Sequence, residues 1–288
     1  MPMSPPAREP ALAAALLTAC ALLAGAAEPV LLADGLRGAS ALAATPNDAG
    51  GLRVLVAESE AQRLTEIVLL GEALLSRDDV GSLPDAGVTG LKLVGERCLV
   101  LTDAGVTSVS LEEWLDEPKA PAGEAVAGPP VSNSRWLFAP GEDALLRGRL
   151  ALGRVTRLRR IDRPDGAPLA IALSPEGYLV SIVSKEEAHR IVFHDPERPE
   201  REGAGYPLDG LTTPRAIAYV GPPQGASLLA IDSEGGWRRV ISRSTDTGTR
   251  AVAEPIDGPE GAVAFWPTPT GSLLVLTAER LSLWRPDL

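Results

Sequence analysis

Cysteine, histidine, asparagine and lysine are scarce in this chain of 288 residues, and their scarcity excludes several kinds of site. The two cysteines are Cys20 and Cys98, and if Cys20 leaves with an N-terminal leader, no intramolecular disulfide can form. His189 and His194 lie five residues apart on a predicted strand, so they face opposite sides and cannot share a metal ion. None of the three lysines follows a glycine, which excludes a phosphate-binding loop.

Catalytic motifs are also missing. The chain has no Gly-x-Ser-x-Gly nucleophile elbow and no glycine-rich dinucleotide loop. The formal net charge of −11 argues against nucleic acid as a partner and against anionic membranes bound through bulk charge. Cys98 sits in an apolar run and is predicted to be a buried small hydrophobic residue, not a reactive thiol. We therefore assign no catalytic residue and no cofactor.

The first 27 residues are typical of a bacterial secretory signal. Arg8 supplies the positive charge, Ala11–Ala24 is an uninterrupted run of Ala, Leu, Thr and Cys, and Gly25–Ala27 is a small-residue cleavage site. The run is shorter than the ~20 apolar residues that span a bilayer, which favours a signal over a membrane anchor. Residues 28–288 then form a single domain that is secreted or periplasmic.

A lipid anchor is the alternative fate of this segment. Leu17-Thr18-Ala19-Cys20 resembles the lipobox of bacterial lipoproteins, in which the cysteine is lipidated after cleavage. The apolar run continues past Cys20, which favours ordinary cleavage. Contact with a membrane is expected only through this anchor.

A weak repeat of short apolar strands extends through the rest of the chain. Each unit has an apolar strand, a turn, a second apolar strand, a polar break and a third strand. The units are Ala39–Ile67, Gly87–Leu111, Pro168–His194, Pro214–Ile241 and Gly261–Trp284. No segment shows a sustained helical period with caps, so the fold class is all-β.

The spacing of the units predicts their number. Ala170, Ala216 and Ala262 begin the first strands of three successive units at a 46-residue interval. The gap between Leu91 and Ala170 leaves room for a further, divergent unit, predicted over residues 132–161, whose strands are Arg135–Ala139, Ala144–Leu150 and Val155–Ile161. Six units of this kind predict a six-bladed β-propeller.

The ring must also close. The last unit has three strands, and the N-terminal segment Pro29–Ala33 is a lone strand without a neighbour in sequence. Placing Val30–Leu32 as the outer strand of the last blade removes two exposed sheet edges at once.

Two of the units resemble a known family. Leu52–Ile67 resembles the second and third strands of an NHL-type repeat, and Ala216–Ala218 with Leu229–Asp232 fits the same pattern. The broader relatives are six-bladed propellers of the gluconolactonase/regucalcin and streptogramin-lyase types. The likeness is at the level of the fold, which many unrelated activities share.

The resemblance implies a divalent ion in the central channel, held in the regucalcin-like family by a Glu, two Asn and an Asp from different blades. This chain has only Asn47 and Asn133, and only Asn133 precedes a predicted inner strand, so it is a candidate ligand-binding residue. Oxygen ligands could be rebuilt from acids at strand ends, namely Glu58, Asp103, Asp232 and Glu260. Solvated turn residues are the favoured interpretation of these four, so no metal site is assigned.

One charge feature runs against the acidic composition. Seven arginines and a single acid lie between Arg147 and Arg163. Arg157 and Arg159 are predicted to share one strand face and Arg160 the other. They could dock an acidic protein or an anionic polysaccharide. The favoured alternative is a solvated outer strand paired with neighbouring acids such as Glu112, Glu113, Asp116 and Glu117.

The sequence thus predicts a secreted or periplasmic propeller that acts as a binding or scaffold module of unidentified ligand. The alternative is a metal-dependent lactone hydrolase or lyase, which needs at least three ligands converging at one end of the channel.

Overall fold

The computed structural model describes residues 27–111, 120–151, 154–163, 165–185, 188–246 and 248–288, and within these residues every regular element is a strand. The predicted leader with Cys20 and the acids at 112–117 lie outside the described residues. No helix in the described part is long and apolar enough to cross a membrane.

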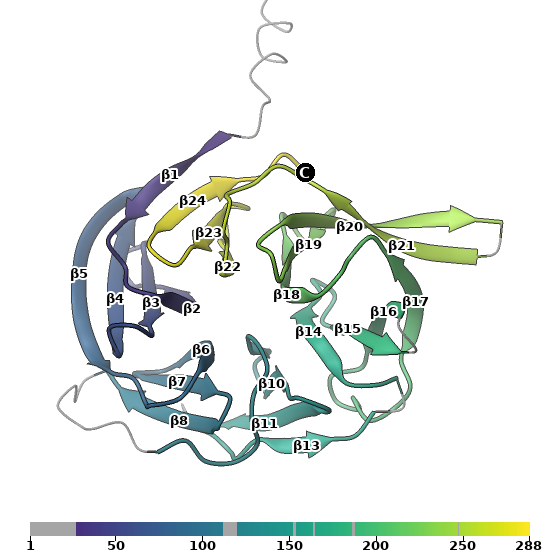
Figure 1. Cartoon of the computed structure of the whole chain (residues 1–288), viewed down its shortest axis with the longest axis horizontal. Coiled ribbons are helices and arrows are strands. Elements are labelled where there is room, and N and C mark those ends of the chain that lie inside the picture. Colours follow the sequence, from purple (N-terminus) through teal and green to yellow (C-terminus); the bar gives the residue numbers. More distant parts are fainter. Residues whose placement is uncertain (1–26, 112–119, 152–153, 164, 186–187, 247) are drawn as a thin grey trace, which may run out of the picture.

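The strands form mostly antiparallel sheets arranged around a central opening, which is the architecture of a β-propeller (Figure 1). The first sheet contains β2 (Ala39–Pro46), β3 (Leu52–Glu58), β4 (Arg63–Leu70) and β5 (Ala73–Ser82). The second contains β6 (Val88–Val94), β7 (Arg97–Thr102) and β8 (Gly105–Ser110). The third contains β9 (Val131–Ser132), β10 (Trp136–Pro140), β11 (Leu145–Ala151), β12 (Arg154–Val155) and β13 (Arg159–Ile161).

The fourth sheet joins two four-stranded meanders. One is β14 (Pro168–Leu173), β15 (Leu179–Lys185), β16 (Ala188–His194) and β17 (Ala204–Asp209). The other is β18 (Pro214–Val220), β19 (Ser227–Asp232), β20 (Trp237–Thr245) and β21 (Gly248–Pro255). Their outer strands β17 and β21 pair in parallel through Leu208 with Ala251 and Asp209 with Val252, and this pairing joins the two meanders into one eight-stranded sheet. Figure 1 shows the β20–β21 hairpin extending beyond the ring.

The N-terminal strand completes the last sheet. β1 (Ala27–Ala33) pairs antiparallel with β24 (Leu281–Arg285), which follows β22 (Ala264–Pro267) and β23 (Leu273–Leu276). Leu32 and Leu36 are buried in the core between this sheet and β2–β5. The predicted pairing of the two ends of the chain is therefore present.

The hydrophobic core is divided among the interfaces between sheets. Each of the six core clusters found in the described residues lies between two neighbouring meanders. One of the six lies between the last sheet, which contains β1, and the first sheet, β2–β5. The apolar side chains on both faces of the middle strands explain this arrangement, since Val54, Leu55, Val56 and Ala57 of β3 are all fully buried.

The divergent unit differs from its prediction. Its inner strand is the two-residue β9, so Trp136 lies on the second strand β10 and not on an inner strand. The predicted third strand, Val155–Ile161, is split into β12 and β13, both of which pair with β11. The sequence pattern missed β9 because two residues are too few to show a strand period.

Candidate functional site

A cavity of about 450 Å³ lies at the centre of the ring. Its wall is built from β2, β6, β9, β14, β18 and β22, the innermost strand of each meander, together with residues 127–130 before β9. This volume falls in the range of pockets that hold small organic ligands.

A repeated β-bulge sets which side chains reach this cavity. The inner strands β2, β6, β14 and β18 each carry one extra residue near their start, opposite the end of the second strand. The extra residues are Ser40, Thr89, Leu169 and Arg215. A bulge redirects the side chain that it contains. Ser40, Thr89 and Arg215, each at the bulge of its inner strand, all line the cavity.

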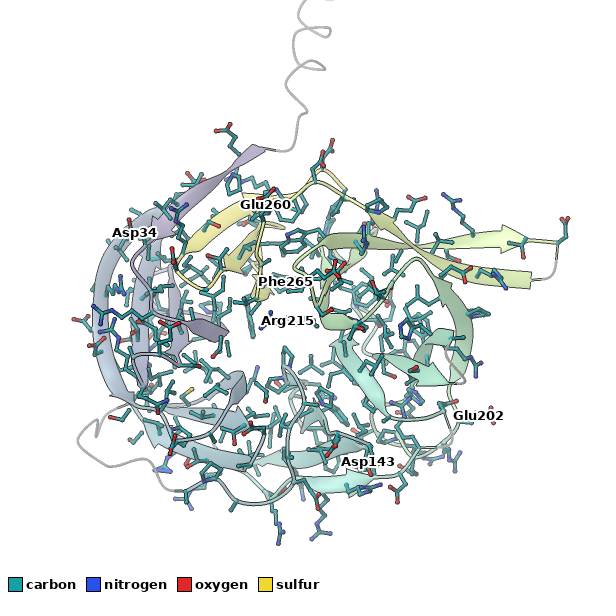
Figure 2. All side chains as sticks on the ribbon, viewed as in Figure 1. Asp34, Asp143, Glu202, Arg215, Glu260 and Phe265 are labelled. Atoms are coloured by element: carbon teal, nitrogen blue, oxygen red, sulfur yellow. The ribbon has the colours of Figure 1, made fainter. Side chains whose placement is uncertain are left out.

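Most of the cavity wall is apolar. Leu42, Ile171 and Ile217 come from equivalent positions on three inner strands, and Phe265 and Trp266 add two aromatic rings from β22. Figure 2 labels Phe265 and Arg215 close to each other at the edge of the opening. A ligand that fills this space would therefore contact mainly carbon atoms.

The charged lining consists of two cations. Lys92 and Arg215 are the charged residues among those that line the cavity, and the described lining contains no Asp, Glu, His or Asn. The charged groups that line the cavity are thus positive, although the net charge of the protein is −11.

Lys92 is half-buried on β6, and its ammonium lies 5.5 Å from the centroid of the Trp266 ring. Burial lowers the pKa of Lys92 below its usual value, because a low-dielectric surrounding disfavours the charged form. Within the described residues its side chain forms no ion pair, so the aromatic ring is its main favourable contact.

Arg215 is exposed and lies at the bulge of β18. No ion pair or hydrogen bond occupies its guanidinium within the part of the chain that the structure describes. The arrangement leaves the donors of Arg215 free to bind an oxyanion, which a guanidinium contacts through two parallel N–H groups.

The four candidate metal ligands do not come together. Within the described ranges, no group of three or more His, Cys, Asp or Glu side chains could hold a metal ion. Glu58 and Asp232 end the second strands β3 and β19 on different meanders, so the ring itself separates them. The metal ligand set implied by the family resemblance therefore does not fit the residues of this channel.

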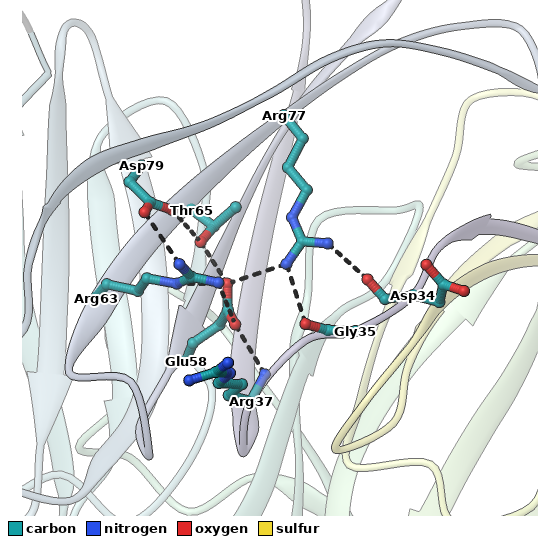
Figure 3. A network of polar contacts seen from close by, with 8 residues as sticks. All are labelled: Asp34, Gly35, Arg37, Glu58, Arg63, Thr65, Arg77 and Asp79. Carbon is teal, nitrogen blue, oxygen red and sulfur yellow. Dashed lines mark hydrogen bonds and ion pairs between the residues drawn. The ribbon is translucent and has the colours of Figure 1, made fainter.

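Glu58 instead holds a buried ion-pair network (Figure 3). Its side chain is fully buried and accepts hydrogen bonds from Arg63 Nε and Nη2 at 3.1 and 3.0 Å, Thr65 Oγ1 at 2.5 Å and the Arg37 amide at 2.8 Å. The Arg77 guanidinium lies 3.6 Å away. Burial by itself would raise the pKa of Glu58, but these donors outweigh it and lower the pKa below its usual value.

The other three acids have ordinary local roles or lie exposed. Asp103 Oδ1 accepts the Gly87 amide at 3.0 Å. Asp232 is buried, and its Oδ1 accepts the amides of Glu234 and Gly236 at 3.1 and 2.8 Å while Arg238 lies 3.4 Å from Oδ2. Glu260 is exposed.

Asn133 is a turn residue and does not line the cavity. Its Oδ1 accepts the amides of Arg135 and Trp136 at 2.9 and 2.7 Å, which fixes the turn between β9 and β10. Its candidate role in binding therefore has no geometric support. An asparagine two or three residues before a strand is typical of such a turn.

The arginine-rich segment is partly paired. Arg160 forms ion pairs with Asp143 at 2.6 Å and Asp162 at 2.7 Å. Arg157 and Arg159 are exposed and form no ion pair within the described residues, but Arg157 lies before β13, so the predicted shared strand face is absent. Docking of an anionic partner here stays a prediction.

His194 ends strand β16 and lies in a buried polar cluster. Its Nε2 contacts Arg163 Nη2, its Nδ1 donates to the Arg201 carbonyl at 3.2 Å, and Asp165 Oδ2 lies 3.7 Å away. Burial, together with the Arg163 charge, lowers the pKa of His194 to about 4. The imidazole is neutral at pH 7 and accepts from Arg163.

The lowered pKa of His194 predicts a loss of stability in mild acid. The unfolded chain binds a proton at about pH 6.5 and the folded chain only near 4, so the free energy of unfolding falls as pH decreases through this window. At pH 5 the expected loss is about 1–2 kcal/mol relative to pH 7. Urea titrations of the protein and of His194→Gln at both pH values measure it. An equal pH dependence in the variant would contradict the assignment.

Sequence comparison identifies no relative, since neither a protein-family model nor a curated protein matches the chain. Solved structures do match. A gluconolactonase from Xanthomonas campestris has a TM-score of 0.56 at 13% identity, covering 92% of each chain. The PQQ-bound aldose sugar dehydrogenase of Streptomyces coelicolor has a TM-score of 0.54 at 14% identity, covering 91% of this chain and 97% of that one.

A third match, the α-L-arabinanase of Penicillium chrysogenum complexed with arabinobiose, has a TM-score of 0.56 at 11% identity, with 90% and 98% coverage. The fold-level resemblance to gluconolactonase-type propellers is therefore confirmed. At such low identities these likenesses show the fold alone, and the three names describe different activities.

Proposed function

We propose that the protein is a six-bladed binding propeller, each half of the eight-stranded sheet being one blade, whose central channel holds a small organic anion with an apolar ring. The observation that carries this proposal is the lining of the cavity, in which Lys92 and Arg215 are the only charges in an otherwise uncharged and mostly apolar described wall. The proposal includes export of the chain by its N-terminal signal.

Two physical arguments support an anion over a cation or a neutral molecule. A half-buried ammonium without a counter-charge is unfavourable, so an incoming carboxylate would gain by pairing with Lys92. Divalent cations prefer several oxygen ligands, and the described lining offers no carboxylate.

A ring suits the body of the ligand. Trp266 and Phe265 border the cavity, and aromatic side chains pack well against flat apolar groups. The cavity is large enough for one substituted ring and its carboxylate.

The metal-dependent lactone hydrolase or lyase is the alternative. Structural neighbours include gluconolactonases, but their likeness extends only to the fold. The described donors in this channel do not fit a divalent cation, which favours the binding role over this alternative.

Calorimetric titration with benzoate, using benzyl alcohol as the neutral analogue, tests the proposal. Benzoate is expected to bind in the millimolar range or better, and benzyl alcohol at least tenfold more weakly. Lys92→Met keeps the apolar stem, and together with Arg215→Gln it is expected to weaken benzoate binding by roughly 10- to 100-fold, because a hydrogen bond to a charged group contributes ~1.5–3 kcal/mol.

Arg149→Gln is the matched control, since Arg149 is an exposed arginine on β11 outside the cavity. Equal binding of the acid and the alcohol would contradict the proposal. A rise in melting temperature with millimolar Ca²⁺ in place of benzoate would favour the metal-dependent alternative.

A further inference from the structure

The two cations that line the channel lie at different levels of the ring, where a level is a position counted along an inner strand from its bulge. Arg215 is the bulge residue of β18 and Thr89 is the bulge residue of β6, so these two positions are equivalent. Lys92 follows Thr89 by three residues on the same inner strand. Because a strand rises about 3.3 Å per residue, the backbone of Lys92 lies about 10 Å further along the channel wall than the level of Arg215.

The charge of Lys92 stays at its own level, because it contacts Trp266 there. Trp266 is opposite Leu274 on β23. Ala218, three residues after the bulge of β18, is opposite Leu229 on β19. Leu274 and Leu229 are each the second leucine of a Leu-Leu pair near the start of the strand, so Trp266 and Ala218 share a level with Lys92. The ammonium of Lys92 lies 5.5 Å from the centroid of the Trp266 ring.

Between the two cations the wall is apolar. The second residue after the bulge is a large aliphatic residue on four inner strands, namely Leu42, Leu91, Ile171 and Ile217. All four line the cavity. A ligand that contacts both cations must therefore cross an apolar level, where removal of its own carbon atoms from water is favourable.

One acidic group cannot neutralise both cations at these two levels. Within the described residues, neither Arg215 nor Lys92 forms an ion pair, and the lining offers no Asp or Glu. An ion pair needs its nitrogen and oxygen atoms within about 4 Å, so a single carboxylate bound at one level leaves the other charge without a partner. Two acidic groups, separated by an apolar spacer, would satisfy both.

We propose that the ligand of the channel is a dianion, with one acidic group at the level of Arg215, the other at the level of Lys92 and an apolar ring between them. This inference rests on the proposed function, which requires an organic anion in the channel and leaves the number of its acidic groups open. Arg215 is exposed and Lys92 is half-buried, so the acidic group at Lys92 is the one that loses more contact with water.

Calorimetric titration of the protein with four benzene carboxylates tests the inference. Terephthalate carries two carboxylates on opposite sides of its ring, and phthalate carries the same charge on adjacent ring carbons. Monomethyl terephthalate keeps the size of terephthalate with one charge, and benzoate is the parent acid. Terephthalate is expected to bind about tenfold more tightly than its monomethyl ester or phthalate, because a hydrogen bond to a charged group contributes this much.

Single substitutions separate the two levels. Lys92→Met and Arg215→Gln are each expected to weaken terephthalate binding about tenfold, because each removes the partner of one carboxylate. Each should change benzoate binding only slightly, since a lone carboxylate still has the other cation available. Benzoate binding by a single variant therefore also shows that the variant is folded. Arg149→Gln, outside the cavity, should leave the affinity for terephthalate unchanged.

The outcomes distinguish this inference from the proposed function. Equal affinity for terephthalate and its monomethyl ester, with benzoate still bound, would overturn the dianion and leave an anion-binding channel standing. Phthalate that binds as tightly as terephthalate would overturn the dianion as well, by showing attraction of charge without a match in length. Failure of all four acids to bind would overturn both.

Discussion

A chain that lacks residues 28–36 is expected to melt far below the intact protein, or to fail to fold. The deletion removes β1, exposes the edge of β24 and takes Leu32 and Leu36 out of the core between the first and last sheets. Loss of these two buried leucines alone costs about 4 kcal/mol or more, before the lost hydrogen bonds are counted. Thermal unfolding followed by circular dichroism measures the effect.

Two point variants separate closure of the ring from a general effect of shortening the chain. Leu32 is 6% exposed and its neighbour Leu31 is 53% exposed, so they differ in burial but not in type. Leu32→Ala is expected to lower stability by about 2–4 kcal/mol, and Leu31→Ala by less than ~0.5 kcal/mol. Comparable melting of the truncated and intact proteins would refute closure by β1.

Glu58→Gln is expected to destabilise the fold by about 3 kcal/mol, although it removes no atom from the core. The carboxylate is fully buried and accepts from Arg63, Thr65 and the Arg37 amide. The neutral amide cannot accept all of these bonds, removes the carboxylate that faces Arg77 and leaves Arg63 with Asp79 alone. Urea denaturation at pH 7 measures the loss.

Acid should remove the same stabilisation. Because the pKa of Glu58 is lower in the folded protein than in the unfolded chain, its contribution is present above about pH 4.5 and is lost as pH falls below it. The variant should therefore lose less stability than the native protein between pH 5 and 3. Glu96→Gln is the control, since Glu96 is 60% exposed and its one ion pair among the described residues is with Arg53. Similar losses for both variants would show that burial of Glu58 contributes nothing.

Much of the fold could be predicted because hairpins are local. The predicted unit Pro168–His194 begins with two apolar runs separated by Ser174–Gly177, and the structure places β14 and β15 there. A proline–glycine turn and an alternating pattern act within about fifteen residues, so the chain around them is enough to define them. Closure by the N-terminal strand was also predictable. An unpaired strand and an unpaired sheet edge both expose N–H and C=O groups, which pairing the two satisfies.

Strands that depend on neighbours were harder to predict. β17 and β21 pair in parallel across the gap between two meanders, and nothing in either sequence indicates that contact. The burial of His194 could not be predicted, because it depends on Arg163 and Asp165, which lie about thirty residues earlier in the chain. The acids at strand ends looked alike in sequence, yet Glu58 and Asp232 are buried and Glu260 is exposed.

Of the two charged residues that line the channel, only Lys92 stands out in the local sequence. Lys92 is one of three lysines and lies between Leu91 and Leu93 on a strand, which marks it as unusual. Arg215 follows a proline at the start of a strand, and nothing in the sequence around it indicates a role in the channel. That both line one cavity depends on the bulges and on the closure of the ring, which bring together residues more than a hundred positions apart.

The sequence by itself determined the all-β class, the repeated hairpins and the pairing of the chain ends, because these follow from local periodicity and from the need to cover sheet edges. The tertiary structure alone decided the positive lining of the channel and the burial of Glu58 beside Arg63 and Arg77. Each of these depends on which side chains from distant segments face one another, and the two-residue period of a strand leaves that open until bulges and ring closure fix the register.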